Sequence, residues 1–324
     1  MTETREKRAK ENHDVIIRWI KDWFKDKTGP AVLGISGGKD STVCAALLTE
    51  ALGPDRVIGV MMPNGVQADI KDSKKVIEFL GIKGVEVNIV NAYNALSNAI
   101  DINNLTKSSI DCKAYITNTP ARLRMTTLYG IAALCGGFVC NTCNRSEDYV
   151  GYSTKYGDAA GDFTLLNCLT KTEVVELGDY MNLPSELVHK TPSDGMCGKS
   201  DEDNMGFTYD ELDDYLLTFR KPKNPEVLEK IQKMHNNPNT KLKLIPMPSP
   251  AGPWLKVPGV ELRGCMNEKE AKNLGVNNVE FQHGKRNRDF CLAPLNRVEI
   301  LEGRQCLHNC KYCFLGANNP GGCK

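Results

Sequence analysis

The side chains best suited to chemistry in this chain gather in one short turn, Ser36-Gly37-Gly38-Lys39-Asp40-Ser41. An apolar run at 31–35 precedes the turn, and apolar residues at helical spacing follow it, so the pattern predicts a buried strand, a glycine turn and a helix. Such a turn directs backbone N–H groups and a helix N-terminus at one point, where they bind anions. The glycines allow close approach of a phosphate, while the hydroxyls and the lysine add donors. The stretch therefore predicts a phosphate-binding loop.

Asp40 is the unusual member of this turn, because a carboxylate beside phosphates needs a cation such as Mg²⁺ between them. The turn lacks the G-x-x-x-x-G-K-[ST] spacing of a Walker loop. A plain structural turn between a strand and a helix is the alternative reading of these residues alone.

Strands and helices that alternate along the chain must position this turn. Apolar runs predict further strands at 56–62, 85–90 and 138–141. Helical spacing of apolar residues predicts six further helices: within 1–27, at 69–80, from Thr119 or Pro120 to 134, at 169–180, at 209–217 and at 225–234. Polar stretches predict loops at 101–120, 151–162 and 189–203. The alternation indicates an α/β fold, a Rossmann-like parallel sheet with helices on both faces.

Ligands of such a sheet bind at the carboxyl ends of its strands. Gln67 follows the second predicted strand and is therefore placed to hydrogen-bond an adenine edge beside the phosphate loop. A solvated loop glutamine is the alternative.

Composition narrows the class of protein. The chain has 324 residues, of which 41% are hydrophobic and 25% charged, and its net charge is +1. A net charge this small gives no strong electrostatic attraction to nucleic acid or to a membrane surface. No apolar run reaches the roughly 18 residues that a membrane-spanning helix needs. The charged start resembles no secretory signal. The thirteen cysteines are therefore expected to be thiols or metal ligands in a cytoplasmic protein rather than disulfides.

An ordered set of motifs gives the chain a specific resemblance. GISGGKDS resembles the SGGxDS loop of ATP pyrophosphatases, and MMPNGVQAD, ARLRMTTLYG, SEDYVGYSTKYGDAAGD, LTKTEVVEL, KTPSDG and SDEDNMGFTYDELDDYL follow it. The set, within about residues 10–245, resembles the ammonia-dependent NAD synthetases. The resemblance implies an adenine nucleotide alpha hydrolase-like fold and a synthetase domain at 1–245.

The same resemblance implies the activity of a ligase that forms a C–N bond. The carboxylate of deamido-NAD attacks the α-phosphate of ATP, pyrophosphate leaves, and ammonia displaces AMP from the adenylate to give NAD. The expected cofactors are ATP and Mg²⁺, and the expected assembly is a homodimer. No glutamine-hydrolysing domain is recognised in the chain, so free ammonia or a separate ammonia-supplying partner is expected as the nitrogen source.

Roles carried over by the resemblance fall on named positions. Asp40, Lys171 and Ser36 are expected to be catalytic, and Asp40 and Glu147 to coordinate Mg²⁺. The residues expected to bind ATP are Gly34, Ile35, Ser36, Gly37, Gly38, Lys39, Asp40, Ser41, Gln67, Thr142, Lys171 and Ser193. Those expected to bind deamido-NAD are Arg122, Lys155, Asp162 and Lys241. Arg122 and Arg124 point to different faces of a helix, and Arg124 is expected to form a structural ion pair.

The chain also departs from the family pattern. Ser193 stands where a threonine is common, and Lys241 lacks the histidine that usually precedes it. Cys140 and Cys143 have the C-x₂-C spacing of a metal site, but they are interpreted as two small thiols at a strand end.

The residues from 246 to 324 form a Pro- and Cys-rich extension of unknown role. Cys306, Cys310 and Cys313 have the C-x₃-C-x₂-C spacing of radical S-adenosylmethionine enzymes, but too few residues follow for the barrel of that family. A small zinc or iron–sulfur module, completed by Cys323 or His308, is the functional interpretation. An accessory tail with unligated thiols is the alternative.

Two other functions remain open on the sequence alone. A nucleotide-binding scaffold or regulatory protein could keep the loop without catalysis, and another pyrophosphate-loop amidotransferase, such as a GMP synthetase-like enzyme, could share the first motif. The acids Asp40 and Glu147 favour the ligase over the scaffold.

Overall fold

A computed structural model describes residues 3–67, 70–100, 113–190 and 200–237, together with short strands at 280–282, 299–302 and 305–306. The chain divides into two compact units, Met1–Lys241 and Leu242–Lys324. Of the predicted site residues, Ser193, Lys241, Cys310 and Cys313 lie outside the described residues, and Cys306 is described only as the end of a strand. The domain functions predicted for 1–245 and 246–324 stay predictions.

The first unit is built on a five-stranded parallel sheet. Its order is β3-β2-β1-β4-β5, so the chain adds strands to one side of β1 and then returns to its other side. The carboxyl ends of β1 and β4 therefore form a topological switch point, where α/β sheets open a crevice for ligands. The strands are β1 Ala31–Gly34, β2 Val57–Met61, β3 Lys83–Glu86, β4 Phe138–Asn141 and β5 Phe163–Thr164.

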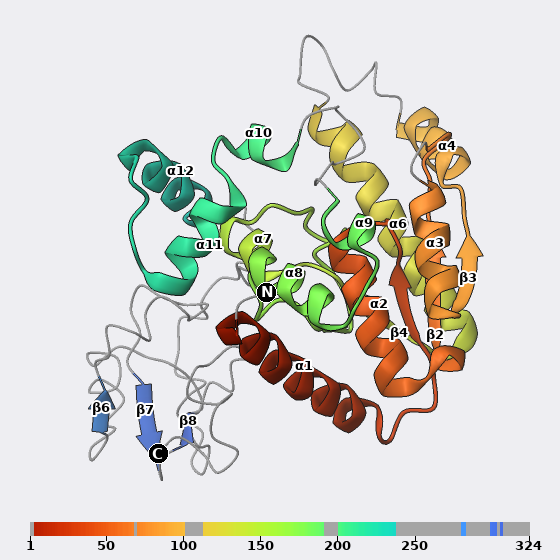
Figure 1. Cartoon of the computed structure of the whole chain (residues 1–324). Helices are drawn as coiled ribbons and strands as arrows, with labels where there is room; N and C mark the ends of the chain where they lie inside the picture. Colours follow the sequence, from red (N-terminus) through yellow and green to blue (C-terminus); the bar gives the residue numbers. More distant parts are fainter. Residues whose placement is uncertain are drawn as a thin grey trace, which may run out of the picture. The chain divides into compact units, whose positions relative to one another are not determined.

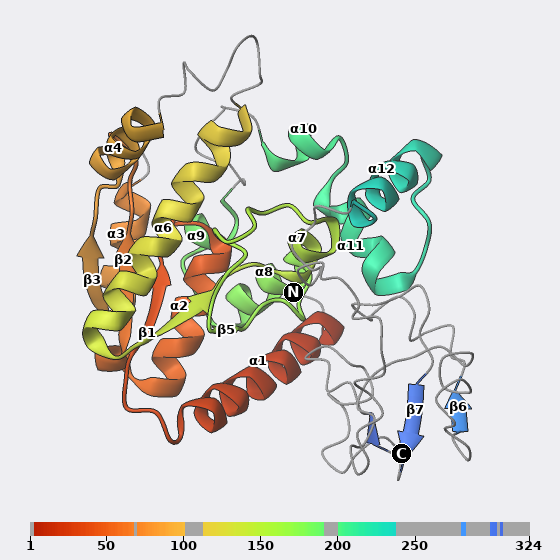
Figure 2. The same cartoon turned by 180° about the vertical axis from the view of Figure 1, so that it is seen from behind.

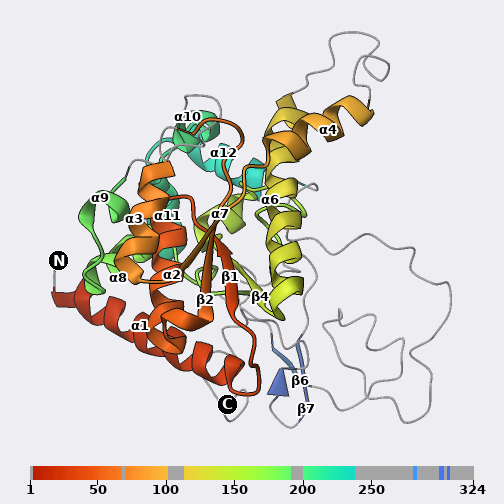
Figure 3. The same ribbon diagram turned by 90° about the vertical axis from the view of Figure 1, so that its right-hand side faces the viewer.

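Helices cover both faces of this sheet (Figures 1 and 3). The main helices are α1 Glu3–Phe24, α2 Lys39–Leu52, α3 Ile70–Leu80, α4 Val90–Ile100, α6 Lys113–Cys135, α7 Arg145–Val150, α8 Lys171–Tyr180, α11 Tyr209–Thr218 and α12 Pro225–His235. Shorter helices are the 3₁₀ helix η1 Pro54–Arg56, α9 Ser185–Val188 and α10 Asp201–Met205. The predicted α/β sheet with two covered faces is confirmed.

Alternation along β1 explains why both faces are covered. Ala31 and Leu33 belong to a core with α1, α2 and α8, whereas Val32 belongs to a second core with Met125 and Leu128 of α6. Figure 2, seen from behind, shows α6 running across the strands. A strand that is buried on both faces needs apolar residues at every position, which is why the sequence has a continuous apolar run at 31–35.

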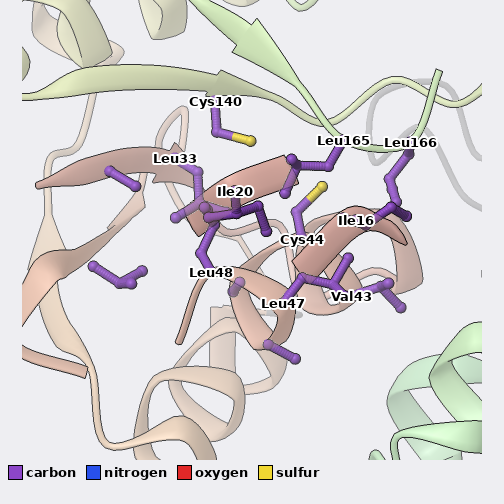
Figure 4. Packing of buried hydrophobic residues seen from close by; sticks show 14 of the residues in the cluster. Ile16, Ile20, Leu33, Val43, Cys44, Leu47, Leu48, Cys140, Leu165 and Leu166 are labelled. Atoms are coloured by element: carbon purple, nitrogen blue, oxygen red, sulfur yellow. The ribbon is translucent and has the colours of Figure 1, made fainter. Parts of the chain in front are cut away.

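The larger core fixes the helix that follows the phosphate loop. Ile20 of α1 and Leu47 and Leu48 of α2 are fully buried in this core. Figure 4 shows Ile20 and Leu48 close to Leu33 of β1, with the sulfur of Cys44 on the side of Cys140. The docking of α1 and α8 on α2 therefore holds the start of α2 rigidly against the sheet.

Several predicted boundaries are wrong. The strand expected at 85–90 is β3 at 83–86, and α4 begins at Val90. α6 begins at Lys113, with Pro120 inside the helix rather than at its start. A helix, α10, begins at Asp201 inside the loop expected at 189–203 and ends at Met205, and the short strand β5 was not predicted.

The second unit is described only by three short strands. β6 Glu280–Gln282, β7 Glu299–Glu302 and β8 Gln305–Cys306 form an antiparallel sheet in that order. In the described part of the chain, no helix combines the length and apolar character needed to cross a membrane.

The turn between β1 and α2 packs tightly against α3. A Cβ added at Gly37 would come within 2.8 Å of both the Cβ of Asp72 and the backbone N of Ser73. The φ of Gly37 is +75°, a region that favours glycine. Glycine is therefore required here for both the backbone conformation and the close approach.

Gly37→Ala should lower the free energy of unfolding more than Gly81→Ala does, with a difference of about 1 to 3 kcal/mol. Gly81 also has a positive φ, +62°, but a Cβ added there would meet only open space. Both changes therefore carry the backbone strain, and only the first adds the clash. Urea denaturation of the two variants measures the difference. Equal destabilisation would contradict the packing described.

A second prediction concerns pH and the contact between α1 and α2. Burial opposes the charge of His13, but hydrogen bonds to the carboxylates of Glu50 and Asp14, at 2.9 and 3.1 Å, outweigh it and raise the pKa of His13 above 6.5. The stabilisation is therefore complete below pH 6.5 and is lost as the pH rises through the folded-state pKa. Relative to His13→Gln, the wild type should lose stability between about pH 6 and 8, measured by urea denaturation. Glu50→Gln should shrink this pH dependence, and an unchanged dependence would exclude the pair as its cause.

Candidate active site

A cavity of about 710 Å³ opens at the carboxyl ends of the strands. It is bounded by the turn after β1, the end of β2, one side of α6, the turn after β4 and the start of α8. Most of the residues expected to bind ATP line it: Gly34, Ile35, Ser36, Gly38, Lys39, Asp40, Ser41, Gln67, Thr142 and Lys171. A cavity of this size can enclose a nucleotide.

The phosphate loop is held open by its own serines. The Oγ of Ser36 lies 3.1 Å from the Oγ of Ser41 and accepts a hydrogen bond from the backbone N of Gly38. The Oγ of Ser41 in turn donates to the carbonyl of Gly38. These bonds set the shape of the turn before any ligand binds.

The N-terminus of α2 lacks a side-chain cap among the described residues. Gly38 occupies the cap position, and it has no side chain that could bond to the first N–H groups of the helix. By contrast, α7, α8 and α11 are capped by Asn144, Thr170 and Thr208. Uncapped N–H groups of a helix facing a cavity bind anions, because their partial positive charges add.

A chain of polar contacts joins this loop to two other elements. Asn144, after β4, donates to Asp40 at 3.0 Å and also caps α7. Glu147 of α7 accepts from Lys171 Nζ of α8 at 3.1 Å. Lys171 is only 5% exposed, so its ammonium group is held in place. The structure thus brings Ser36, Asp40, Glu147 and Lys171 to one cavity, while their roles stay predictions.

Burial and neighbouring charges shift the pKa values of three side chains in this cluster. Burial raises the pKa of Asp40 to about 6, and the negative charge of Glu147 adds to the effect. Burial opposes the charge of Lys171, but Glu147, Asp40 and Asp201 outweigh it and raise the pKa of Lys171. Burial, followed by repulsion from Lys171, lowers the pKa of Lys39. Two half-buried carboxylates that line the same cavity are a natural place for a cation.

Asp40 and Glu147 fit a magnesium ion by their chemistry. Both offer hard carboxylate oxygens to the same cavity, and the raised pKa of Asp40 shows an acid that a divalent cation would stabilise as the anion. Among the described residues, no group of three or more His, Cys, Asp or Glu side chains could hold a metal by itself. Mg²⁺ commonly uses one or two carboxylates and completes its shell with water and phosphate oxygens.

Two residues of this cluster had no role in the sequence prediction. Asp201 Oδ2 lies 3.7 Å from Lys171 Nζ, and the ring of Tyr209 faces the same ammonium at 3.8 Å from its centroid. Asp201 belongs to the SDEDN stretch and Tyr209 to the following FTYDELDDYL stretch. Their spacing carries no signal for this contact, which depends on how α10 and α11 pack.

The described residues expected to bind deamido-NAD do not line the cavity, unlike most of those expected to bind ATP. Arg122 is exposed and donates from Nε to the carbonyl of Lys155 at 3.2 Å. Asp162 accepts from the backbone N of Val139 at 2.7 Å and from Tyr129 at 3.4 Å. Arg122, Lys155 and Asp162 are absent from the described lining of the cavity, so their roles stay predictions.

Arg124, rather than Arg122, lines the cavity. Its Nε donates to the carbonyl of Met62 at 3.0 Å. The structural ion pair expected of Arg124 stays a prediction. Burial lowers the pKa of Arg124, which Asp158 partly offsets.

Cys140 and Cys143 lie beside the cavity as small thiols. Their sulfurs donate to the carbonyls of Asn141 and Asp158, at 3.4 and 3.3 Å. This arrangement agrees with the interpretation as strand-end thiols.

Comparison with known proteins supplies the family. A family model described as NAD synthase matches residues 13–246. The NH₃-dependent NAD⁺ synthetase of Syntrophomonas wolfei is 36% identical over 243 residues, which cover 73% of this chain and 96% of that protein.

Two solved structures share the fold. The NMN synthetase from Francisella tularensis matches with a TM-score of 0.66 and 34% identity, covering 74% of this chain and 98% of that one. The NAD⁺ synthetase from Burkholderia pseudomallei matches with a TM-score of 0.59 and 27% identity, covering 70% and 87%. The matched segment contains the phosphate loop, Glu147 and Lys171, and the chain belongs to the NAD synthase family.

Proposed function

We propose that this chain is a ligase that amidates deamido-NAD with ammonia to form NAD⁺, converting ATP to AMP and pyrophosphate. The observation that carries the proposal is the convergence of an uncapped helix N-terminus, two acids and a buried lysine on one cavity. Membership of the NAD synthase family and identity to NH₃-dependent synthetases support the substrates.

The chemistry needs charge to be neutralised where pyrophosphate departs. A carboxylate is a poor acyl donor until one of its oxygens becomes part of a good leaving group. In this proposal the N–H groups at the start of α2 and the hydroxyls of Ser36 and Ser41 bind the departing phosphates. Lys171, prepositioned by Glu147, supplies a fixed positive charge, so little reorganisation is needed as charge develops.

Enzymes of this family use ATP and Mg²⁺. Asp40 and Glu147 would hold the ion, and the ion would neutralise phosphate charge next to the loop. Lys39 adds a second cation at the same end of the cavity.

The remaining assignments complete the proposal. Thr142, Gln67 and Ser193 would contact ATP, and Arg122, Lys155, Asp162 and Lys241 would contact deamido-NAD. A homodimer, a cytoplasmic location, an ammonia-supplying partner and a zinc or iron–sulfur site at Cys306, Cys310 and Cys313 remain parts of the prediction.

A second candidate substrate is nicotinate mononucleotide. The similarity to a solved NMN synthetase, at 34% identity over nearly its whole length, favours considering it. Both candidates carry the same carboxypyridine ring and the same reacting carboxylate, so the phosphate loop would act alike on either. They differ in the adenylate half, which only the dinucleotide carries.

One assay tests both substrates. The full chain is mixed with MgATP and ammonium and either deamido-NAD or nicotinate mononucleotide, and AMP and the amidated product are measured together. The proposal expects equal amounts of AMP and NAD⁺, with deamido-NAD giving the higher kcat/KM. Preference for the mononucleotide would reassign the substrate, while nucleotide binding without AMP would favour a scaffold.

Asp40→Asn should lower kcat by about 10²-fold or more, because it removes a charged ligand for Mg²⁺ while keeping the side-chain shape. Thermal unfolding should show an intact fold. The matched control is Asp55→Asn, a residue of η1 that does not line the cavity, and it should leave kcat unchanged. A rate near that of the wild type in Asp40→Asn would remove Asp40 from the site.

A further inference from the structure

Helix α11 contributes a buried carboxylate that lies just behind the cavity. Asp213 is 2% exposed, and its Oδ2 accepts hydrogen bonds from the backbone N and the Oγ1 of Thr172, each at 2.7 Å. Its Oδ1 accepts a hydrogen bond from the hydroxyl of Ser146. Asp213 is absent from the cavity lining, so direct binding of a ligand does not explain these contacts.

The donors to Asp213 flank the two charged residues of the site. Ser146 immediately precedes Glu147, and Thr172 immediately follows Lys171. The Ser146 hydroxyl also accepts a hydrogen bond from the backbone N of Lys171 at 3.0 Å. Asp213 therefore joins the first turn of α7 to the first turn of α8, which fixes the backbone separation across which Glu147 and Lys171 pair.

The same face of α11 also holds the head of Lys171. Tyr209 lies four residues before Asp213, so both side chains lie on one face of the helix. The ring of Tyr209 faces the Lys171 ammonium at 3.8 Å, and its hydroxyl donates to Asp201 at 3.3 Å. A cation over an aromatic ring is attracted to it more strongly when both are shielded from water.

Only the inner face of α11, which carries Tyr209 and Asp213, makes these contacts with α7 and α8 among the described residues. Asp214, the next residue, is exposed, and its carbonyl and carboxylate accept hydrogen bonds from Thr218 of the same helix. Breaking the bonds to Asp213 would leave the buried hydroxyl of Ser146 and the half-buried donors of Thr172 without this acceptor, which is unfavourable. The helix starts that carry Glu147 and Lys171 would then relax toward other partners.

We propose that Asp213 and Tyr209 are positioning residues that hold Lys171 and Glu147 in the arrangement needed to bind the phosphates of ATP. The inference rests on the proposed function for its catalytic consequence, but not for its consequence for nucleotide binding. α11 thus acts on the reaction through Lys171 without touching a substrate.

The main test compares Asp213→Asn and Ser146→Ala with the control Asp214→Asn. Asparagine at 213 keeps the shape but replaces one acceptor oxygen by a donor. We expect kcat to fall about 10- to 100-fold and half-saturation by Mg²⁺ to rise in the first two variants, with little change in the control. ATP affinity measured calorimetrically in EDTA should also weaken, about tenfold, because Lys171 is displaced.

Tyr209 has its own pair of variants. Tyr209→Leu removes the ring and should weaken ATP binding in EDTA several-fold, whereas Tyr209→Phe keeps the ring and should restore most of that affinity. If Asp213→Asn does not fold, Ser146→Ala and the Tyr209 pair still decide the question.

Folded variants at Asp213, Ser146 and Tyr209 that bind ATP like the wild type in EDTA would overturn the inference. A loss of thermal stability with unchanged ATP affinity and kcat per folded molecule would show a merely structural role. If the wild type binds ATP but makes no product, the proposed function fails while the ATP measurements still test the positioning.

Discussion

The site depends on one buried ion pair, between Lys171 and Glu147. A lysine that is only 5% exposed keeps its charge only with carboxylates close by, because burial disfavours the charged form. Glu147 at 3.1 Å and Asp201 at 3.7 Å satisfy that requirement. Lys171 is therefore a fixed positive charge, and the elements that carry these three residues must keep their places for the charge to persist.

That constraint explains the architecture around the cavity. Helices α7 and α8 begin with capping boxes at Asn144 and Thr170. Because these boxes fix the first turn of each helix, they also fix the backbone positions of Glu147 and Lys171. The phosphate loop is the contrasting element, since Gly38 leaves the start of α2 without a cap of its own. Side-chain caps thus hold the helix starts that carry Glu147 and Lys171, whereas the start of α2, which faces the cavity, has none and is left for a ligand. This division suits an enzyme that must bind phosphates and then release them.

The fold was largely predictable from sequence because its central strands are apolar and uninterrupted. The run at 31–35 and the run at 138–141 indicated β1 and β4, and the alternation of strands and helices indicated the parallel sheet. β3 was displaced because it is mostly exposed and lacks an apolar run of its own. The start of α6 was missed because Pro120 is typical of a first helical turn, yet here it lies inside the helix.

Some residues of the candidate site could also be predicted from the sequence, and others could not. The phosphate loop, Asp40, Glu147 and Lys171 could be named from motifs, because their chemistry is local or carried by the family resemblance. Tyr209 and Asp213 could not, since DELDD offers several acids and only the packing of α11 selects the inward one. The contact of Arg124 with the carbonyl of Met62 could not be predicted either, because Met62 becomes its neighbour only when α6 lies across the end of β2.

The central claim is that the turn after β1 binds the phosphates that leave ATP, with a metal shared by two acids. The most direct measurement is a crystal structure of the full chain with Mg²⁺ and a non-hydrolysable ATP analogue. The account predicts phosphate oxygens on the N–H groups at the start of α2, with the ion between Asp40 and Glu147. A triphosphate bound elsewhere, with that turn empty, would contradict it.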